Sequence, residues 1–171
     1  MSIGIVLETD RLLLREVVLE DDKFILALLS DPLWQKFIAP HSIDSVIKAR
    51  DYIRERLVLS YQKGYGLWVV VVKELGIPVG ICGLLKRDYL DDVDLGYAFL
   101  ESFRGLGYAH ESSKAVLRIL APKISTGKVL AMTHPGNSAS ISLLNKLGFR
   151  FLYSYQKPDC KDIIQIYRLE M

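Results

Sequence analysis

The sequence predicts a single α/β domain over residues 1–171. Length and composition suit one hydrophobic core, because 50% of the 171 residues are hydrophobic and 25% are charged. The uninterrupted apolar and largely β-branched run of residues 67–72 is typical of a buried strand. Residues 94–109, DLGYAFLESFRGLGYA, indicate a strand, a short turn and a glycine-rich helix start. Strands and helices are therefore expected together in one domain.

The charge and the apolar pattern argue against nucleic-acid-binding and membrane proteins. The formal net charge is +2 and no basic run stands out, so no nucleic acid partner is expected. Residues 1–11 lack the basic start of a signal peptide, and no apolar stretch reaches 18 residues, so no membrane association is expected. Cys82 and Cys160 are too few for a disulfide framework or a metal site. We expect no metal and a cytoplasmic location.

The first 40 residues are expected to hold a strand and a short helix. Residues 11–15 favour the strand, and the helix begins near residue 19 and ends at Asp31 and Pro32, where proline stops it. Trp34, Phe37 and Ile38 are expected in a loop or half-turn. These three large apolar side chains either join the core or wall the pocket of an acceptor substrate.

A long helix is expected over residues 43–62, capped by Ser42 or Asp44. Apolar residues recur on one side at helical spacing and charged residues take the other side. This pattern favours a scaffold helix with a solvated face. The apolar set is Ile43, Val46, Ile47, Ile53, Leu57 and Tyr61.

The second half of the chain is expected to alternate strands with two helices. Residues 67–72 and 79–85 predict a hairpin in which Cys82 is an inert core residue. The next strand begins at Val93, and Gly96 within it usually marks a bulge or a close backbone approach. A helix over 107–121, a strand over 127–133 and a helix from Asn137 to Gly148 follow. Residues 149–155 and 163–169 are expected to be closing antiparallel strands.

Residues 104–109, RGLGYA, are a candidate anion site at the start of a helix. Such a start directs unpaired backbone N–H groups and the positive end of the helix dipole at one point. Gly105 and Gly107 allow an anion to sit on the backbone, and Arg104 adds a fork of donors that suits phosphate oxygens. The segment therefore predicts a pyrophosphate site. Tyr108 stands where a P-loop has Lys, and His110 stands where a dinucleotide fingerprint has Gly or Ala.

The spacing of Arg104, Gly107 and Ala109 resembles the acetyl-CoA motif of the GNAT N-acetyltransferases, [Q/R]-x-x-G-x-[G/A]. The segment HPGNSASISLLNKLGF, about 30 residues later, resembles a second motif of that family, N-x-x-S followed by K-x-G-F. The opening phrase LETDRLLLRE, with the later Asp31 and Pro32, is similar to the ribosomal-protein N-terminal (alanine/serine) acetyltransferase subgroup. The resemblance extends over most of the chain.

The resemblance implies a GNAT-like α/β (α+β) domain over 1–171. Its central sheet would be mixed but mostly antiparallel, with a splayed parallel strand pair and helices on both faces. The strand after residue 93 would be bulged, and its backbone would pair with the pantetheine arm of acetyl-CoA. The residues implied in binding that co-substrate are Tyr97, Ala98, Phe99, Leu100, Arg104, Gly105, Leu106, Gly107, Tyr108, Ala109, Asn137 and Ser140. Asn137 is equally suited to cap the helix that it precedes.

Transfer of an acetyl group to an amine needs a base, an oxyanion donor and an acid for the leaving thiolate. Many GNAT enzymes use a tyrosine as the acid, but Leu144 stands in that slot here, and the subgroup implies Ser140 instead. Tyr153 and Tyr155 are the reserve acids on the following strand. The resemblance suggests Asp94 as the base and a backbone N–H near Tyr97 to Phe99 as the oxyanion donor. Asp92 is the reserve base, and both carboxylates are equally suited to being solvated strand ends.

The expected function is N-acetyl transfer from acetyl-CoA to a primary amine by direct attack in a ternary complex. The acceptor is left open between a protein N-terminus and a small-molecule amine, because the selecting loops at 31–45 and 155–162 carry no readable code. His41 and His110 are unassigned. The alternatives are a CoA-binding sensor or degenerate acetyltransferase without turnover, and an enzyme for a longer acyl donor. Both a monomer and a homodimer are compatible with the sequence.

Overall fold

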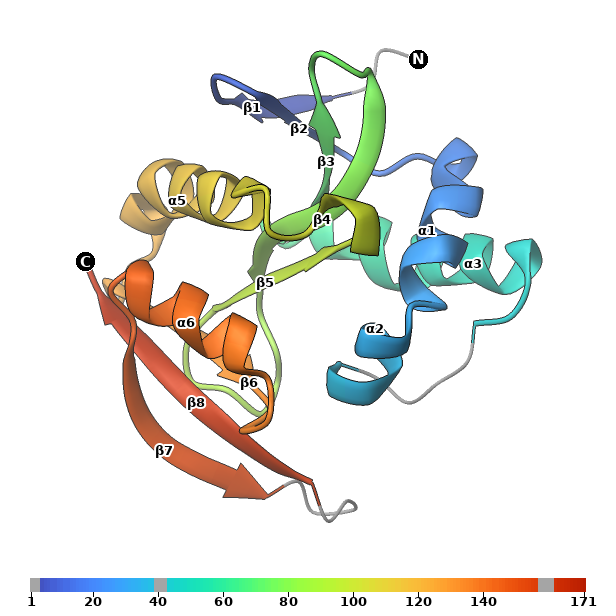
Figure 1. The fold of residues 1–171 in the computed structure, drawn as a ribbon. Coiled ribbons are helices and arrows are strands. Elements are labelled where there is room, and N and C mark those ends of the chain that lie inside the picture. Colours follow the sequence, from blue (N-terminus) through green and yellow to red (C-terminus); the bar gives the residue numbers. More distant parts are fainter. Residues whose placement is uncertain (1–3, 39–42, 157–161) are drawn as a thin grey trace.

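A computed structural model describes residues 4–38, 43–156 and 162–171, which form a mixed sheet flanked by helices (Figure 1). The eight strands lie in the order β1-β2-β3-β4-β5-β6-β8-β7. Every neighbouring pair is antiparallel except β5 and β6, which are parallel. The strands are β1 Ile5–Glu8, β2 Leu12–Arg15, β3 Gly66–Val72, β4 Ile77–Leu85, β5 Asp94–Phe99, β6 Lys128–Thr133, β7 Arg150–Gln156 and β8 Ile163–Glu170. The predicted mostly antiparallel sheet is confirmed.

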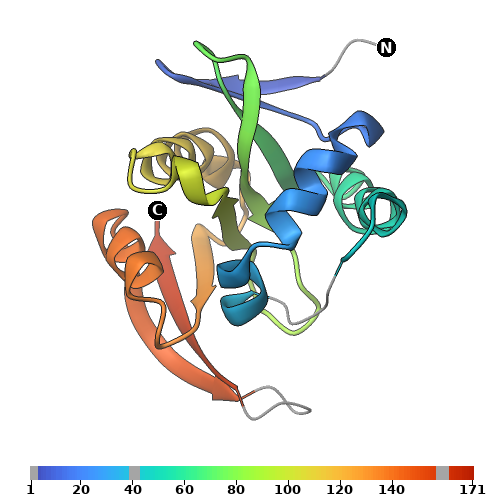
Figure 2. The same ribbon diagram turned by 45° about the vertical axis from the view of Figure 1, so that its right-hand side comes forward.

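Helices cover both faces of the sheet, as expected (Figures 1 and 2). One face carries α1 Asp22–Leu29, α2 Pro32–Phe37, α3 Val46–Tyr52, the π-helical segment η2 Ile53–Val58, and α4 Leu59–Tyr61. The other face carries α5 Tyr108–Leu120 and α6 Ser138–Lys146. Short 3₁₀ turns complete the list: η1 Leu19–Asp21, η3 Glu101–Phe103 and η4 Ala121–Lys123.

The alternation of side chains in β3 divides the core into two layers. Val70 and Val72 pack with α5, whereas Val69 and Val71 pack with α1 and α3 on the opposite face. Both faces of this strand are buried, which explains its continuous apolar sequence. Each fully buried Val, Leu or Ile side chain contributes about 1.5–3 kcal/mol to folding. The paired cores therefore hold the middle of the sheet rigidly.

Strands β5 and β6 diverge soon after they begin. Their ladder contains only the pairs Asp94↔Leu130 and Leu95↔Ala131. The predicted bulge at Gly96 was wrong, because β5 pairs with β4 in unbroken register from Asp94 to Phe99. A Cβ at Gly96 would lie 3.1 Å from Leu67 Cδ2, so the glycine instead makes room for that side chain. The splay begins where the β6 ladder ends.

The predicted helix over 43–62 is broken into three segments. Its N-cap is Ser45, whose hydroxyl accepts the Lys48 N–H, whereas Asp44 pairs with the Lys48 side chain; Ser42 lies outside the described residues. The buried face runs through Ala49, Ile53 and Leu57, four residues apart and continuing into the π-helical segment η2, and it shifts away from Ile47, which is 73% exposed. A uniform helical period cannot anticipate such a shift.

Two further elements were missed. Residues 32–37, expected in a loop or half-turn, form α2, with Asp31 accepting the Leu33 and Trp34 N–H groups and proline at the first helical position. The edge strand β1 was not predicted because it is only four residues long and largely exposed. Trp34 is only 8% exposed and belongs to the core of its face.

Candidate active site

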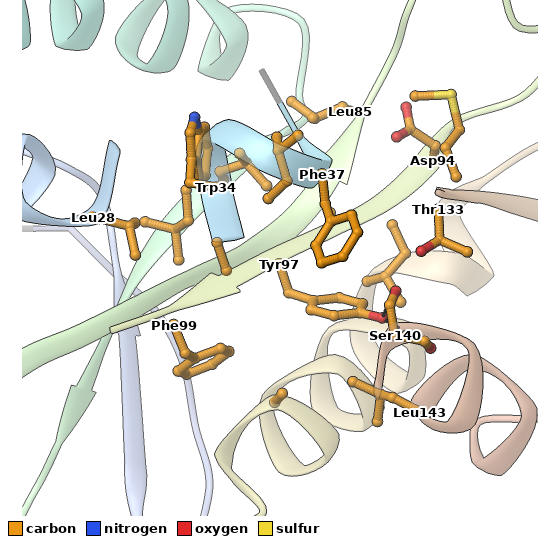
Figure 3. A pocket seen from close by; sticks show the side chains of 18 of the residues that line it. Leu28, Trp34, Phe37, Leu85, Asp94, Tyr97, Phe99, Thr133, Ser140 and Leu143 are labelled. Atoms are coloured by element: carbon orange, nitrogen blue, oxygen red, sulfur yellow. Dashed lines mark hydrogen bonds between the residues drawn. The ribbon is translucent and has the colours of Figure 1, made fainter. Parts of the chain in front are cut away.

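A cleft of about 1500 Å³ extends across the point where β5 and β6 separate. Its walls come from β5, α2 and η2, from the first turn of α5 and from one side of α6. Figure 3 shows side chains of α2, β5, β6 and α6 around the cleft, with Tyr97 reaching from β5 toward Ser140 of α6. The sheet therefore opens a space between its two halves that packed strands would otherwise fill.

The glycine-rich loop forms one end of the cleft. Gly105 and Gly107 have φ angles of 74° and 84°, a backbone conformation that favours glycine. The first hydrogen bond of α5 runs from the Glu111 N–H to the Gly107 carbonyl at 3.0 Å. The N–H groups of Tyr108, Ala109 and His110 precede that bond at the positive end of a 13-residue helix. A helix start with unpaired N–H groups and glycines in this conformation is suited to binding an anion.

Arg104 braces the loop rather than extending as a free fork. Its Nε donates to the Phe99 carbonyl at 2.9 Å, and its Nη2 lies 2.7 Å from Asp31 Oδ1. Asp31 is the buried cap of α2, so the guanidinium joins the loop to β5 and to α2. Part of the charge of Arg104 is therefore neutralised inside the protein. The backbone N–H groups remain the main donors for an anion.

A second brace, which the sequence did not suggest, joins the loop to the turn between β1 and β2. Glu111 Oε1 accepts the Thr9 hydroxyl at 2.6 Å, and Glu111 Oε2 lies 2.6 Å from Arg11 Nη2. Arg11 also donates to the Leu106 carbonyl at 3.1 Å and lies over the Tyr108 ring. Partial burial raises the pKa of Glu111, but the bonds from Thr9 and Arg11 outweigh it and hold that pKa below its ordinary value.

The free edge of β5 is available over only part of the predicted segment. The Leu100 N–H donates to the Val79 carbonyl at 2.9 Å. In the alternating antiparallel ladder, Ala98 and Leu100 therefore direct their backbone groups to β4. Tyr97 and Phe99 direct theirs to the gap beside β6, although Arg104 occupies the Phe99 carbonyl. Of the four residues expected to pair with pantetheine, two face the cleft with their backbones.

Tyr97 and Ser140 meet inside the cleft. The Tyr97 hydroxyl lies 2.9 Å from Ser140 Oγ. Asn137 caps α6, with its Oδ1 accepting the Ser140 N–H at 3.2 Å, as predicted for a helix cap. Leu144, in the slot that the resemblance assigns to a tyrosine acid in many GNAT enzymes, is 1% exposed in the core. The reserve acids Tyr153 and Tyr155 lie on β7 and are not among the residues that line the cleft.

Asp94 lines the cleft at the start of β5 but is 2% exposed. Arg87 Nε donates to both of its oxygens, at 3.0 and 3.1 Å. Burial raises the pKa of Asp94, and the Arg87 charge opposes that rise only in part. A carboxyl with a raised pKa is suited to accepting a proton. The reserve base Asp92 lies in the bend before β5 and is not a lining residue.

Thr133, at the end of β6, places an unsatisfied polar atom at the cleft. It is 6% exposed, and its Oγ1 has no hydrogen-bond partner among the described residues. Figure 3 shows it between Asp94 and Ser140. A buried hydroxyl without a partner costs free energy, so a polar ligand group in the cleft would complete it.

The opposite wall is apolar and aromatic. Trp34 and Phe37 of α2 and Tyr52 of α3 line it. Phe37 reaches across to His134, with ring centroids 5.5 Å apart. Glu55 and Arg56 of η2 also line the cleft, so the charged face expected to be only solvated borders the candidate site. Residues 39–42, which include His41, and 157–161 of the predicted acceptor loops lie outside the described residues.

These features fit acetyl-CoA. The loop suits a pyrophosphate, the open β5 edge suits an amide-bearing arm, and the unsatisfied Thr133 hydroxyl lies along the same cleft.

In residues 4–38, 43–156 and 162–171, no three His, Cys, Asp or Glu side chains gather as a metal site requires. Within the same ranges, no helix has the length and apolar character to cross a membrane.

Residues 11–150 match the family model described as an acetyltransferase (GNAT) domain. The uncharacterized N-acetyltransferase p20 of Bacillus licheniformis is 28% identical over 169 residues, which cover 96% of this chain and 94% of that protein. The uncharacterized protein YkkB of Bacillus subtilis is 33% identical over 56% of this chain and 58% of its own length.

Solved structures share the fold. RimL, a ribosomal L7/L12 alpha-N-protein acetyltransferase solved in complex with coenzyme A, superposes with a TM-score of 0.83 at 18% identity and covers 98% of both chains. A GNAT-family acetyltransferase from Bacillus anthracis gives 0.79 at 20% identity, covering 99% of this chain and 98% of its own. At this identity the likeness establishes the arrangement of strands and helices.

Proposed function

Because the chain belongs to the acetyltransferase (GNAT) family, we propose that its cleft binds acetyl-CoA and transfers the acetyl group to a primary amine by direct attack in a ternary complex. One observation carries this proposal. The anion-binding loop and the free edge of β5 open into the same cleft, next to the Tyr97–Ser140 pair. A pyrophosphate and a thioester at the end of a long arm require such an arrangement.

The donor would be held mainly by backbone groups. The N–H groups of residues 105–109 would bind the pyrophosphate, and Arg104 would keep the loop in place through Asp31. The backbones of Tyr97 and Phe99 would pair with the pantetheine arm, while Asn137 and Ser140 would border its reactive end. Leu106, whose side chain is exposed, would contribute through its backbone alone.

Acetyl-CoA supplies an acetyl group activated as a thioester. Asp94 would accept a proton from the acceptor ammonium, directly or through water, because burial raises its pKa above the ordinary value of a carboxyl group. A β5 N–H facing the gap would stabilise negative charge on the carbonyl oxygen. Ser140 would donate to the departing sulfur. Holding both substrates in one cleft supplies much of the remaining acceleration.

The acceptor would enter along the wall formed by α2 and η2. We propose a primary amine that is either a protein N-terminus or part of a small molecule, because aromatic side chains beside Glu55 and Arg56 can accommodate an amphipathic group. The low cysteine content favours a cytoplasmic protein. The protein would act as a monomer or a homodimer.

The test is an acetyl-transfer assay with acetyl-CoA and a panel of amines, read by mass spectrometry of the products. The panel should contain peptides with different N-terminal residues, polyamines, aminoglycosides and amino acids. We expect an increase of one acetyl group on at least one class and its loss in Asp94→Asn. Binding of acetyl-CoA without transfer to any amine would favour a CoA sensor instead. Transfer from longer acyl-CoA donors alone would indicate a different donor.

A further inference from the structure

Two hydroxyl groups from opposite walls of the cleft lie in direct contact. The Tyr97 hydroxyl is 2.9 Å from Ser140 Oγ and 3.5 Å from the Ser140 carbonyl. Both residues line the cleft, and Figure 3 shows them together between β5 and α6. Asn137 accepts the Ser140 N–H, which fixes the backbone of Ser140 at the start of α6, and the Tyr97 hydroxyl bonds its side chain. The pair is therefore pre-organised rather than incidental.

Tyr97 holds a proton throughout the neutral range. Burial raises the pKa of Tyr97 to about 12, although its bond with Ser140 opposes the rise. Cys82 is its partner on β4, and burial raises the pKa of that thiol to about 11, so it too is neutral. Asp94 stands three residues before Tyr97 and is paired with Arg87. His134 lies on the far side of the gap against Phe37.

We propose that Tyr97 and Ser140 form a proton relay to the sulfur atom released by acetyl transfer. In this relay Ser140 contacts the sulfur, and Tyr97 replaces the proton that Ser140 gives up. The inference rests on the proposed acetyl-CoA reaction. It assigns the Tyr97 side chain a role beyond the backbone pairing of its strand. Tyr97 would supply the phenol that Leu144, which is buried in the core, cannot supply.

Every proton and electron pair in this relay has a destination. The deprotonated amine nitrogen forms a bond to the acetyl carbon while the carbon–sulfur bond breaks, and the electron pair of that bond goes to sulfur. The Ser140 hydroxyl proton moves to sulfur, and the Tyr97 proton moves to Ser140. The Tyr97 phenolate then takes the remaining proton from the newly acylated nitrogen through water. Both side chains end as they began.

The relay has a chemical advantage over Ser140 alone. A serine that gives its proton to sulfur would become an alkoxide, whereas a phenol is a much stronger acid than an alcohol. With Tyr97 behind it, the charge left on the protein is a phenolate. An acid whose pKa is nearer to the working pH transfers a proton more readily.

Binding of CoA itself provides a readout that needs no turnover. A hydrogen bond donated to a thiolate lowers the pKa of that thiol. The pKa of protein-bound CoA thiol can be followed by the ultraviolet absorbance of its thiolate during a pH titration. We expect this pKa to rise by up to about one unit in Tyr97→Phe, because Ser140 then loses the hydrogen bond that strengthens its own donation to the thiolate. Ser140→Ala should produce at least the same rise.

Kinetics test the order of the relay. We expect kcat to fall by about 100-fold in Tyr97→Phe and by at least as much in Ser140→Ala, with the affinity for acetyl-CoA little changed. Because both act on one proton, the double variant should be no slower than Ser140→Ala. Tyr167→Phe is the matched control, since its hydroxyl bonds the Gln165 side chain on β8 away from the cleft.

The outcomes separate the inference from the proposed function. An unchanged CoA thiol pKa and an unchanged kcat in Tyr97→Phe would overturn the relay while leaving acetyl transfer intact. Additive losses in the double variant would also overturn it, because independent roles add. Failure of the wild-type protein to bind CoA would instead overturn the proposed function, and the relay would fall with it.

Discussion

At the scale of single residues, the site depends on positions where a single Cβ, hydroxyl or thiol determines the local geometry or reactivity. Gly107 combines a φ of 84° with close packing, because a Cβ there would lie 3.2 Å from Arg11 Nη2. The Thr133 hydroxyl is buried without a partner among the described residues. Cys82 differs from both, because burial raises the pKa of its thiol and so makes this group unreactive. For Gly107 and Cys82, one substitution or one reagent can check the interpretation.

Replacing Gly107 by Ala is expected to weaken acetyl-CoA binding by about tenfold. A left-handed conformation costs a non-glycine residue roughly 1–2 kcal/mol, and relieving it would turn the loop N–H groups away from the anion. Gly76→Ala is the matched control, because Gly76 has a φ of 66° in the β3–β4 turn and an open surrounding. Both variants should lose similar stability. Equal acetyl-CoA affinity in the two variants, measured by calorimetry, would show that the loop does not bind the donor.

Cys82 is expected to resist alkylation in the folded protein. The side chain is fully buried, and burial raises its thiol pKa to about 11, so almost no thiolate forms at neutral pH. Replacing Cys160 by Ser leaves Cys82 as the remaining thiol of the chain. Mass spectrometry should then show no adduct with iodoacetamide until denaturant is added. Rapid labelling of the native protein would contradict the assignment of Cys82 to an inert core.

At the scale of elements, the braces of the phosphate loop come from distant segments. Arg104 connects the loop to the cap of α2, and Glu111 connects α5 to the turn after β1. Local sequence patterns predicted the loop but neither brace, because the partners are 73 and 100 residues apart. The same limit applies to η2, where a π-helical turn moves residues that a regular period assigns to solvent. Local sequence patterns predict the secondary structure of a segment, but they do not predict which distant residues it contacts in the fold.

Replacing Glu111 by Gln is expected to lower stability at neutral pH and to reduce its dependence on pH. The folded pKa of Glu111 lies below its ordinary value of 4.5, so the unfolded chain binds the proton more tightly. The stabilisation is therefore present above about pH 4.5 and is lost as the pH falls through the folded pKa. Denaturant unfolding of both proteins at neutral and acid pH measures the difference.

Glu8→Gln is the control for that experiment, because Glu8 pairs with Lys73 on the same edge of the sheet but is more exposed. Exposed pairs contribute little, so its effect should be small at every pH. If Glu111→Gln matched Glu8→Gln at neutral pH, the brace would contribute nothing measurable to the fold.

At the scale of the molecule, the order of strands and helices along the chain was the best predicted feature. The strands from β2 to β8 and helices α1, α5 and α6 follow their apolar periods, and the two motifs locate the cleft. The pairing of Tyr97 with Ser140 and of Asp94 with Arg87 could not be read from the sequence, since it depends on how the two halves of the sheet separate. The fold class could therefore be predicted from local patterns, whereas the side-chain contacts in the cleft depend on how the elements assemble.

The most direct test of the central claim is a calorimetric titration of the purified protein with acetyl-CoA, with NAD and ATP as controls. The cleft predicts a single site for acetyl-CoA with a dissociation constant on the order of micromolar, and far weaker binding of the other two nucleotides. Binding should weaken in Gly107→Ala and persist in Gly76→Ala. Absence of acetyl-CoA binding to the wild-type protein would contradict the assignment of this cleft to acetyl-CoA, because residues 104–109 would then form only the start of a helix.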